Sequence, residues 1–151
     1  MSQSLCQIYL HVVFSTKERR PLLQESRCSN AMHKCLAKVS NELGCPCLEA
    51  GGVEDHVHVL SRLSKTLSAS EFVKEMKLAT SAWVKEEFPH MDNFYWQAGY
   101  GAFSVSPSHV DPLQQYIRNQ RQHHHQESFQ DELRRLLRKY EIDFDERYVW
   151  D

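Results

Sequence analysis

The motif His56-Val57-His58 spaces two imidazoles in a way that suits metal binding. It lies in the run Val53–Leu63, whose apolar residues predict a strand. Successive side chains of a strand point to opposite faces, so His56 and His58 share a face, roughly 7 Å apart, while Val57 and Val59 point into a core. Imidazole nitrogens so placed can bind one metal ion, although a His-x-His on a solvated strand is more often plain polar surface.

The second half of the chain carries a candidate nucleophile and a candidate third ligand. Tyr116 and Gln120 are separated by one helical turn and therefore share a face of a predicted helix. A tyrosine that attacks a phosphodiester must lose a proton with a reference pKa of about 10. A divalent ion polarises the phosphate, and imidazoles with an amide oxygen suit Mg²⁺ or Mn²⁺ while leaving positions for phosphate oxygens. The product would be a phosphotyrosine that conserves the bond energy for rejoining. The alternative interpretation is that Tyr116 is an ordinary aromatic on a helix face and Gln120 an ordinary surface residue.

Other residues of metal-binding type are weaker candidates. The consecutive histidines His123–His125 point about 100° apart in a helix and converge poorly on one ion, so we interpret them as a solvated helix end. Cys45-Pro46-Cys47 lacks a second pair at zinc-ribbon spacing, and the odd number of cysteines favours free thiols. For four further histidines, core or surface roles suffice: His11, His33, His90 and His109.

The hydrophobic pattern predicts the order β-α-β-β-α-β followed by helices. The expected strands are Ile8–Phe14, Cys47–Ala50, Val53–Leu63 and Gln97–Val105, and the first helices are expected from Arg27 to Leu43 and from Ser68 to about Pro89. This order is the ferredoxin-like, split β-α-β plan of the α+β class. We expect an antiparallel sheet with helices on one face and the other face open.

The tyrosine is expected on a C-terminal helical extension. Asp111 is predicted as the N-cap of a third helix that runs past Gln120 towards His125. Ser128 is predicted to cap a fourth helix, whose buried stripe is Phe129, Leu133, Leu136, Leu137 and Tyr140. The acidic tail that follows is expected to dock on the body or on a partner chain.

Length and composition bound the class of protein. The chain has 151 residues, of which 41% are hydrophobic and 25% charged, as in ordinary globular domains. We expect one domain over residues 1–151, with a core at about 5–126 and a C-terminal helix and tail at about 127–151. No stretch has the length of a membrane span and the N-terminus does not resemble a signal peptide, so a cytoplasmic protein is expected.

The net charge of −2 argues against a non-specific polyanion binder. Local basic residues can nevertheless contact DNA. The candidates follow the first strand or lie in the tyrosine helix: Lys17, Arg19, Arg20, Arg118 and Arg121.

Taken together, these blocks resemble the small single-strand DNA transposases of bacterial insertion sequences, in the HUH superfamily with one catalytic tyrosine. The resemblance covers nearly the whole chain. It is carried by Val12–Lys17 with Arg19-Arg20-Pro21, Asp55–Leu60, Trp96–Val105, and Tyr116–Gln120 with the following histidines. The net acidity departs from what such an enzyme leads us to expect.

The resemblance implies a metal-dependent DNA transposase. His56, His58 and Gln120 would bind Mg²⁺ or Mn²⁺. Tyr116 would attack a single-stranded DNA end, giving a 5′-phosphotyrosine and a free 3′-OH that later drives strand transfer. It also implies recognition of DNA hairpins, a bacterial or archaeal host, and a homodimer in which the tyrosine helix of one subunit can complete the metal site of the other.

Other functions stay open at this point. A domesticated relative would process repeated chromosomal hairpins with the same chemistry, and the genomic setting would distinguish it. A catalytically silent RNA- or DNA-binding module on the same sheet would stack bases on exposed aromatics without a metal. A structural metal-binding protein would use Cys45, Cys47 and the histidines.

Overall fold

The computed structural model describes residues 2–123 and 126–151. Its sheet contains β1 (Tyr9–Ser15), β2 (Cys47–Gly52), β3 (His56–Arg62) and β4 (Gly101–Val105), in the order β2-β3-β1-β4. All neighbouring strands are antiparallel. This order, with a helix between β1 and β2 and another between β3 and β4, confirms the ferredoxin-like fold.

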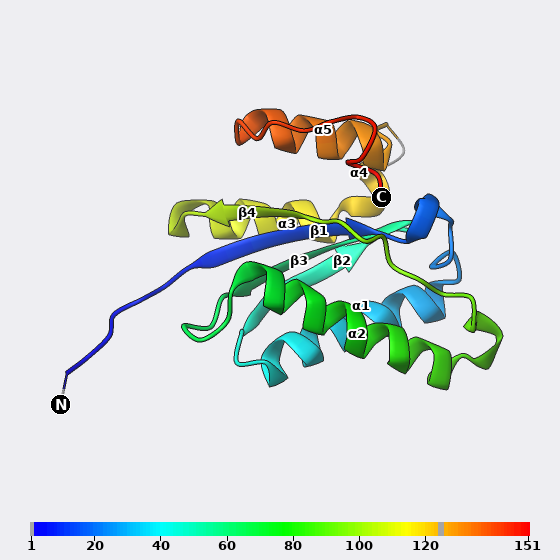
Figure 1. Ribbon diagram of the computed structural model, residues 1–151, viewed down its shortest axis with the longest axis horizontal. Coiled ribbons are helices and arrows are strands. Elements are labelled where there is room, and N and C mark those ends of the chain that lie inside the picture. The colour runs from blue at the N-terminus through cyan, green and yellow to red at the C-terminus, as the bar shows by residue number, and fades with distance from the viewer. Residues whose placement is uncertain (1, 124–125) are drawn as a thin grey trace.

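Helices α1 (Ser26–Glu42) and α2 (Ala69–Glu87) cover one face of the sheet (Figure 1). Strand side chains that alternate along β1 and β3 form the core on this face with both helices: Leu10, Val12, Phe14, Val57 and Val59. Val57 and Val59 therefore point into a core, as the strand pattern predicts. Their neighbours His56 and His58 must point to the other face.

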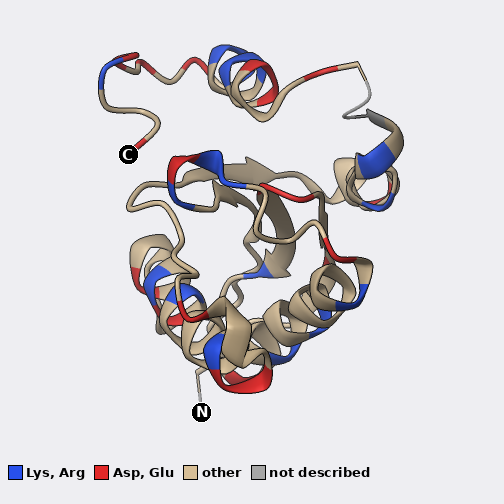
Figure 2. Cartoon of the chain, turned by 90° about the vertical axis from the view of Figure 1, so that its right-hand side faces the viewer, with Lys and Arg blue, Asp and Glu red and all other residues tan. Residues whose placement is uncertain are grey.

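The other face is not open, contrary to our expectation. It is covered by the C-terminal part of the chain, which contains α3 (Val110–Arg118), α4 (Gln120–His123) and α5 (Phe129–Lys139) (Figure 1, Figure 2). The buried stripe of α5 packs on sheet residues in a second cluster: Val13, Phe103, Phe129, Leu133, Leu136 and Leu137. An amphipathic helix needs an apolar surface, and Val13 with Phe103 provides one.

Two helix starts agree with their predicted caps. The Ser68 side chain accepts a hydrogen bond from the Glu71 amide at α2, and Ser128 does the same for Asp131 at α5. The third predicted helix is different. It begins at Val110, so Asp111 lies in its first turn rather than at the N-cap, and the chain leaves helical geometry at Asn119 before α4 begins.

Strand β4 is shorter than predicted because residues 97–99 are held by other groups. The Lys77 ammonium of α2 donates to the carbonyl oxygens of Gln97, Ala98 and Gly99 at 2.8, 3.2 and 2.7 Å. The tail docks on the same segment, where the Asp151 carbonyl accepts from the Gly99 amide at 2.8 Å. The tail thus lies against the body of its own chain. Within the described part of the chain, no helix has both the length and the apolar character of a membrane span.

We predict that Lys77→Met lowers the free energy of unfolding by about 1–3 kcal/mol, because three carbonyl acceptors lose a charged donor. Lys74→Met is the matched control, since Lys74 lies on the same helix and is exposed. Urea unfolding followed by circular dichroism measures both variants. Equal stability of the two variants would show that these hydrogen bonds contribute nothing measurable.

Candidate metal and tyrosine site

His56 and His58 form the floor of a buried site on the sheet face that α5 covers. Both side chains are fully buried, and their ring centroids lie 5.2 Å apart. Buried polar groups require partners. The partners of these imidazoles come from a neighbouring loop, from β1 and from the C-terminal helices.

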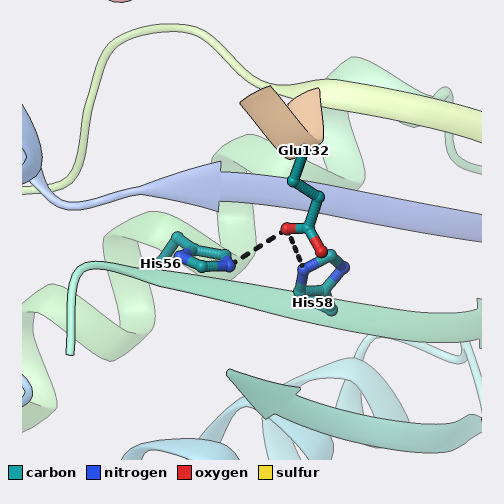
Figure 3. Close-up of side chains that lie close together, drawn as sticks. All are labelled: His56, His58 and Glu132. Atoms are coloured by element: carbon teal, nitrogen blue, oxygen red, sulfur yellow. Dashed lines mark hydrogen bonds and ion pairs between the residues drawn. The ribbon is translucent and has the colours of Figure 1, made fainter. Parts of the chain in front are cut away.

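Glu132 of α5 is the residue that joins the site together (Figure 3). Its Oε1 lies 3.2 Å from Nε2 of His56 and 2.9 Å from Nε2 of His58, and the carboxylate is fully buried. The sequence analysis missed Glu132. A signal was present, because Glu132 lies three residues after Phe129 and four before Leu136, within the apolar stripe of α5. A charge on a buried stripe indicates a polar partner inside the protein.

Tyr116 and Gln120 reach the same carboxylate despite the break between α3 and α4. The Tyr116 hydroxyl donates a short hydrogen bond to Oε2 of Glu132, and Gln120 Nε2 donates to this oxygen at 3.2 Å. Gln120 Oε1 lies 3.2 Å from Nε2 of His56. The structure therefore brings together His56, His58, Tyr116 and Gln120 within one chain.

The tyrosine helix approaches the sheet closely because β2 presents a glycine to it. A Cβ atom on Gly51 would lie 2.9 Å from both the Cγ2 and the carbonyl oxygen of Ile117. Ile117 follows Tyr116 and is buried. The absence of a side chain at Gly51 thus permits the close approach of α3 to β2, the strand that pairs with the histidine-bearing β3.

A second set of hydrogen bonds orients the imidazoles. Nδ1 of His56 lies 2.7 Å from Oδ1 of Asp55, and Nδ1 of His58 lies 2.8 Å from Nε2 of His11. Each pair holds the Nδ1 side, so both Nε2 atoms face Glu132, an arrangement typical of histidine ligands. His11 is buried, as a core role predicts, but its contact with His58 was not foreseen from the sequence. His11 lies on β1, next to β3, and its ring stacks on that of His58.

The electrostatics of the site reflect burial and this carboxylate. Burial acts to lower the pKa of His56, but hydrogen bonds to Asp55 and Glu132 outweigh it and raise that pKa to about 9. Burial, followed by the charge on His58, lowers the pKa of His11 well below its usual value. Burial and the Glu132 charge raise the pKa of Tyr116. A cation bound next to Tyr116 would act in the opposite direction and favour the phenolate.

The donors fit a divalent metal ion. Ligand atoms of His56, His58 and Glu132 all lie within 4.8 Å of one another. Bonds of roughly 2.1 Å to a central ion place neighbouring ligand atoms about 3 Å apart, close to the donor separations seen here. A site with both imidazole and oxygen donors suits Mn²⁺. Mg²⁺ prefers oxygen ligands, so the two imidazoles make this site less typical of Mg²⁺ than of Mn²⁺.

The other metal candidates are not brought together among the residues described. Cys45 and Cys47 are free thiols and belong to no such group of ligands there. In the run His123–His125, His124 and His125 lie outside the described residues, as does the side chain of His123.

The basic residues proposed for DNA form two groups at one end of the sheet. The first follows β1, where Arg20 pairs with Glu18 at 2.9 Å and the guanidinium of Arg19 lies 5.8 Å from the Trp150 ring centroid. The exposed Lys17 belongs to this group. The Thr16 amide bonds to the Asp55 carbonyl at 2.8 Å, which places the group beside His56.

The second basic group lies where α3 meets α4. Arg118 bonds to Glu49 at 2.9 Å, and Arg121 is exposed. Both line a cavity of about 390 Å³ together with Gly51 and Gly52. Figure 2 faces this end of the molecule and shows basic residues interspersed with acidic ones.

A ferredoxin-like sheet with a buried His-x-His pair beside a tyrosine helix is the arrangement expected of a single-tyrosine DNA transposase. Residues 4–120 match the family described as "Transposase IS200 like", and the chain belongs to this family. Transposases for insertion sequence element IS200 from Salmonella typhimurium and Salmonella typhi are each 27% identical over 115 residues, which cover 73% of this chain and 74% of theirs.

Solved structures share the fold. The crystal structure of a candidate transposase from Deinococcus radiodurans superimposes with a TM-score of 0.64 at 23% identity, covering 80% of this chain and 98% of that one. A REP-associated tyrosine transposase bound to a REP hairpin gives a TM-score of 0.58 at 15% identity, covering 82% of this chain and 74% of that one. At these identities the likeness concerns the fold alone.

Proposed function

We propose that the protein is a metal-dependent single-stranded DNA transposase that cleaves and rejoins DNA through a 5′-phosphotyrosine on Tyr116. The observation that carries this proposal is the convergence of Tyr116, Gln120, His56 and His58 on one buried carboxylate. Membership of the IS200-like family supplies the reaction class.

His56, His58 and Gln120 would hold Mg²⁺ or Mn²⁺, which supplies Lewis-acid polarisation of the scissile phosphate. The Tyr116 oxygen gives up its proton and forms a bond to phosphorus as the bond to the 3′ oxygen breaks. The leaving 3′ oxygen takes up a proton and becomes a free 3′-OH, so the step neither consumes nor releases a net proton. Arg135 donates to the Tyr116 hydroxyl at 2.8 Å and would stabilise negative charge on that oxygen. In strand transfer a 3′-OH attacks the phosphotyrosine and releases Tyr116.

We propose single-stranded DNA with hairpins as the substrate. The fold neighbour described as bound to a REP hairpin supports this substrate class. The two basic groups flank the His56 end of the sheet and are our candidates for backbone contacts: Lys17, Arg19, Arg20, Arg118 and Arg121. Since Tyr116 lies against the histidine pair of its own chain, we propose cleavage in cis, within a homodimer.

The test is a covalent-capture assay with the wild-type protein. Labelled single-stranded hairpin DNA from the ends of the protein's own element is incubated with Mg²⁺ or Mn²⁺ and analysed by denaturing electrophoresis. We expect a protein–DNA adduct that requires the ion and that mass spectrometry assigns to Tyr116. Hairpin binding without an adduct would instead support the non-catalytic binding module.

A further inference from the structure

We propose that Glu132 is a fourth protein ligand of the divalent ion and that the same carboxylate positions the nucleophile. This inference rests on the proposed function. Glu132 lies beyond residue 120, where the match to the family ends, so its role is argued from this chain alone. It connects the ion site to Tyr116 through a single side chain.

The two carboxylate oxygens face different groups. Oε1 lies between the Nε2 atoms of His56 and His58, at 3.2 and 2.9 Å, where an ion bound by the imidazoles would also be within reach of this oxygen. Oε2 accepts hydrogen bonds from the Tyr116 hydroxyl and from Gln120. A carboxylate that binds the ion through one oxygen thus fixes the phenol through the other.

The buried charge itself favours a cation at this place. A fully buried carboxylate is costly unless a cation and hydrogen bonds compensate it. Glu132 is 0% exposed and faces imidazole nitrogens that can bind either a proton or a metal ion. A metal ion would replace the protons on these imidazole nitrogens, because metal ligands bind in their deprotonated form. Its positive charge would then compensate the charge of the Glu132 carboxylate.

Helix α5 is anchored well enough to act as a support for the site. Its apolar stripe packs on Val13 and Phe103 of the sheet, so α5 cannot withdraw Glu132 without exposing this cluster. One turn further along, Arg135 donates to the Tyr116 hydroxyl and is itself paired with Glu127 at 3.0 Å. Helix α5 therefore presents an acceptor and a donor to the same phenolic oxygen.

One rival explanation makes the opposite prediction. Glu132 would then be a competitor that fills the site and must leave when an ion binds. A ligand strengthens ion binding, whereas a competitor weakens it. The Mn²⁺ affinity of a variant without the charge separates the two roles.

The experiment is isothermal titration of Mn²⁺ into DNA-free protein. We expect Glu132→Gln to bind Mn²⁺ about 10- to 100-fold more weakly than the wild type. The control is Asp131→Asn, which removes the same charge from the adjacent, 66% exposed position of α5 and should stay within about twofold of the wild type. Unchanged or tighter binding by a folded Glu132→Gln protein overturns the proposal.

A measurement on the wild type guards against misfolding of the variant. Hydrogen exchange with and without Mn²⁺ should show increased protection of α5 as well as β3, because Glu132 would tie the helix to the ion. Protection of β3 without any change in α5 overturns the proposal. If the wild type binds no Mn²⁺ at all, both the metal dependence of the proposed function and the role of Glu132 are wrong. Mn²⁺ binding by the wild type that does not depend on Glu132 overturns the role of Glu132 alone.

Discussion

Tyr116→Phe is expected to abolish the covalent protein–DNA adduct while the protein still binds hairpin DNA. Phenylalanine keeps the ring but removes the oxygen that attacks phosphorus. Loss of a nucleophile typically lowers the rate by about 10⁴- to 10⁶-fold. The rate of adduct formation on denaturing gels and hairpin affinity by fluorescence anisotropy measure the two effects separately.

The matched control is Tyr140→Phe. Tyr140 and Tyr116 line the same cavity of about 260 Å³, but the Tyr140 ring packs on Phe103 with centroids 4.8 Å apart. We expect this variant to form the adduct at close to the wild-type rate. If Tyr116→Phe still formed an adduct at that rate, the nucleophile would be another residue and our reaction scheme would be wrong.

Much of the fold follows from local patterns in the sequence. Alternation along β3 places Val57 and Val59 in one core and the histidines on the other face, and the predicted caps at Ser68 and Ser128 are present. These features depend on residues only a few positions apart, so their pattern can be seen in the sequence itself. Tyr116 and Gln120 do reach the same carboxylate, but the continuous helical turn predicted between them is interrupted at Asn119.

The parts that could not be predicted depend on distant contacts. Glu132 and His58 are 74 positions apart, and His11 and His58 are 47 apart, so only the folded sheet with α5 brings them together. The break at Asn119 was missed because no glycine or proline marks it. The second face of the sheet was expected to be open because the apolar stripe of α5 shows that the helix packs on something but not which surface it packs on.

His56→Ala is expected to lower the rate of DNA cleavage by about 10³-fold or more while hairpin affinity changes only a few-fold. The substitution removes one imidazole ligand, and a Lewis acid contributes several kcal/mol to phosphoryl-transfer chemistry. The substitution also removes the imidazole that contacts both the Asp55 and the Glu132 carboxylates. Cleavage rates at saturating DNA, hairpin affinity and thermal unfolding are measured on the same preparation.

His90→Ala is the control for His56→Ala, because His90 is an exposed histidine in a short 3-10 helix after α2. An equal loss of cleavage and hairpin binding in His56→Ala would show that His56 is structural.

Mixing Tyr116→Phe with His56→Ala then tests which chain supplies the nucleophile. Cleavage in cis leaves the mixture inactive, since every chain lacks either the tyrosine or an ion ligand. Recovered activity would require the tyrosine helix of one subunit to reach the histidine pair of the other, which would contradict the cis arrangement seen in the single chain.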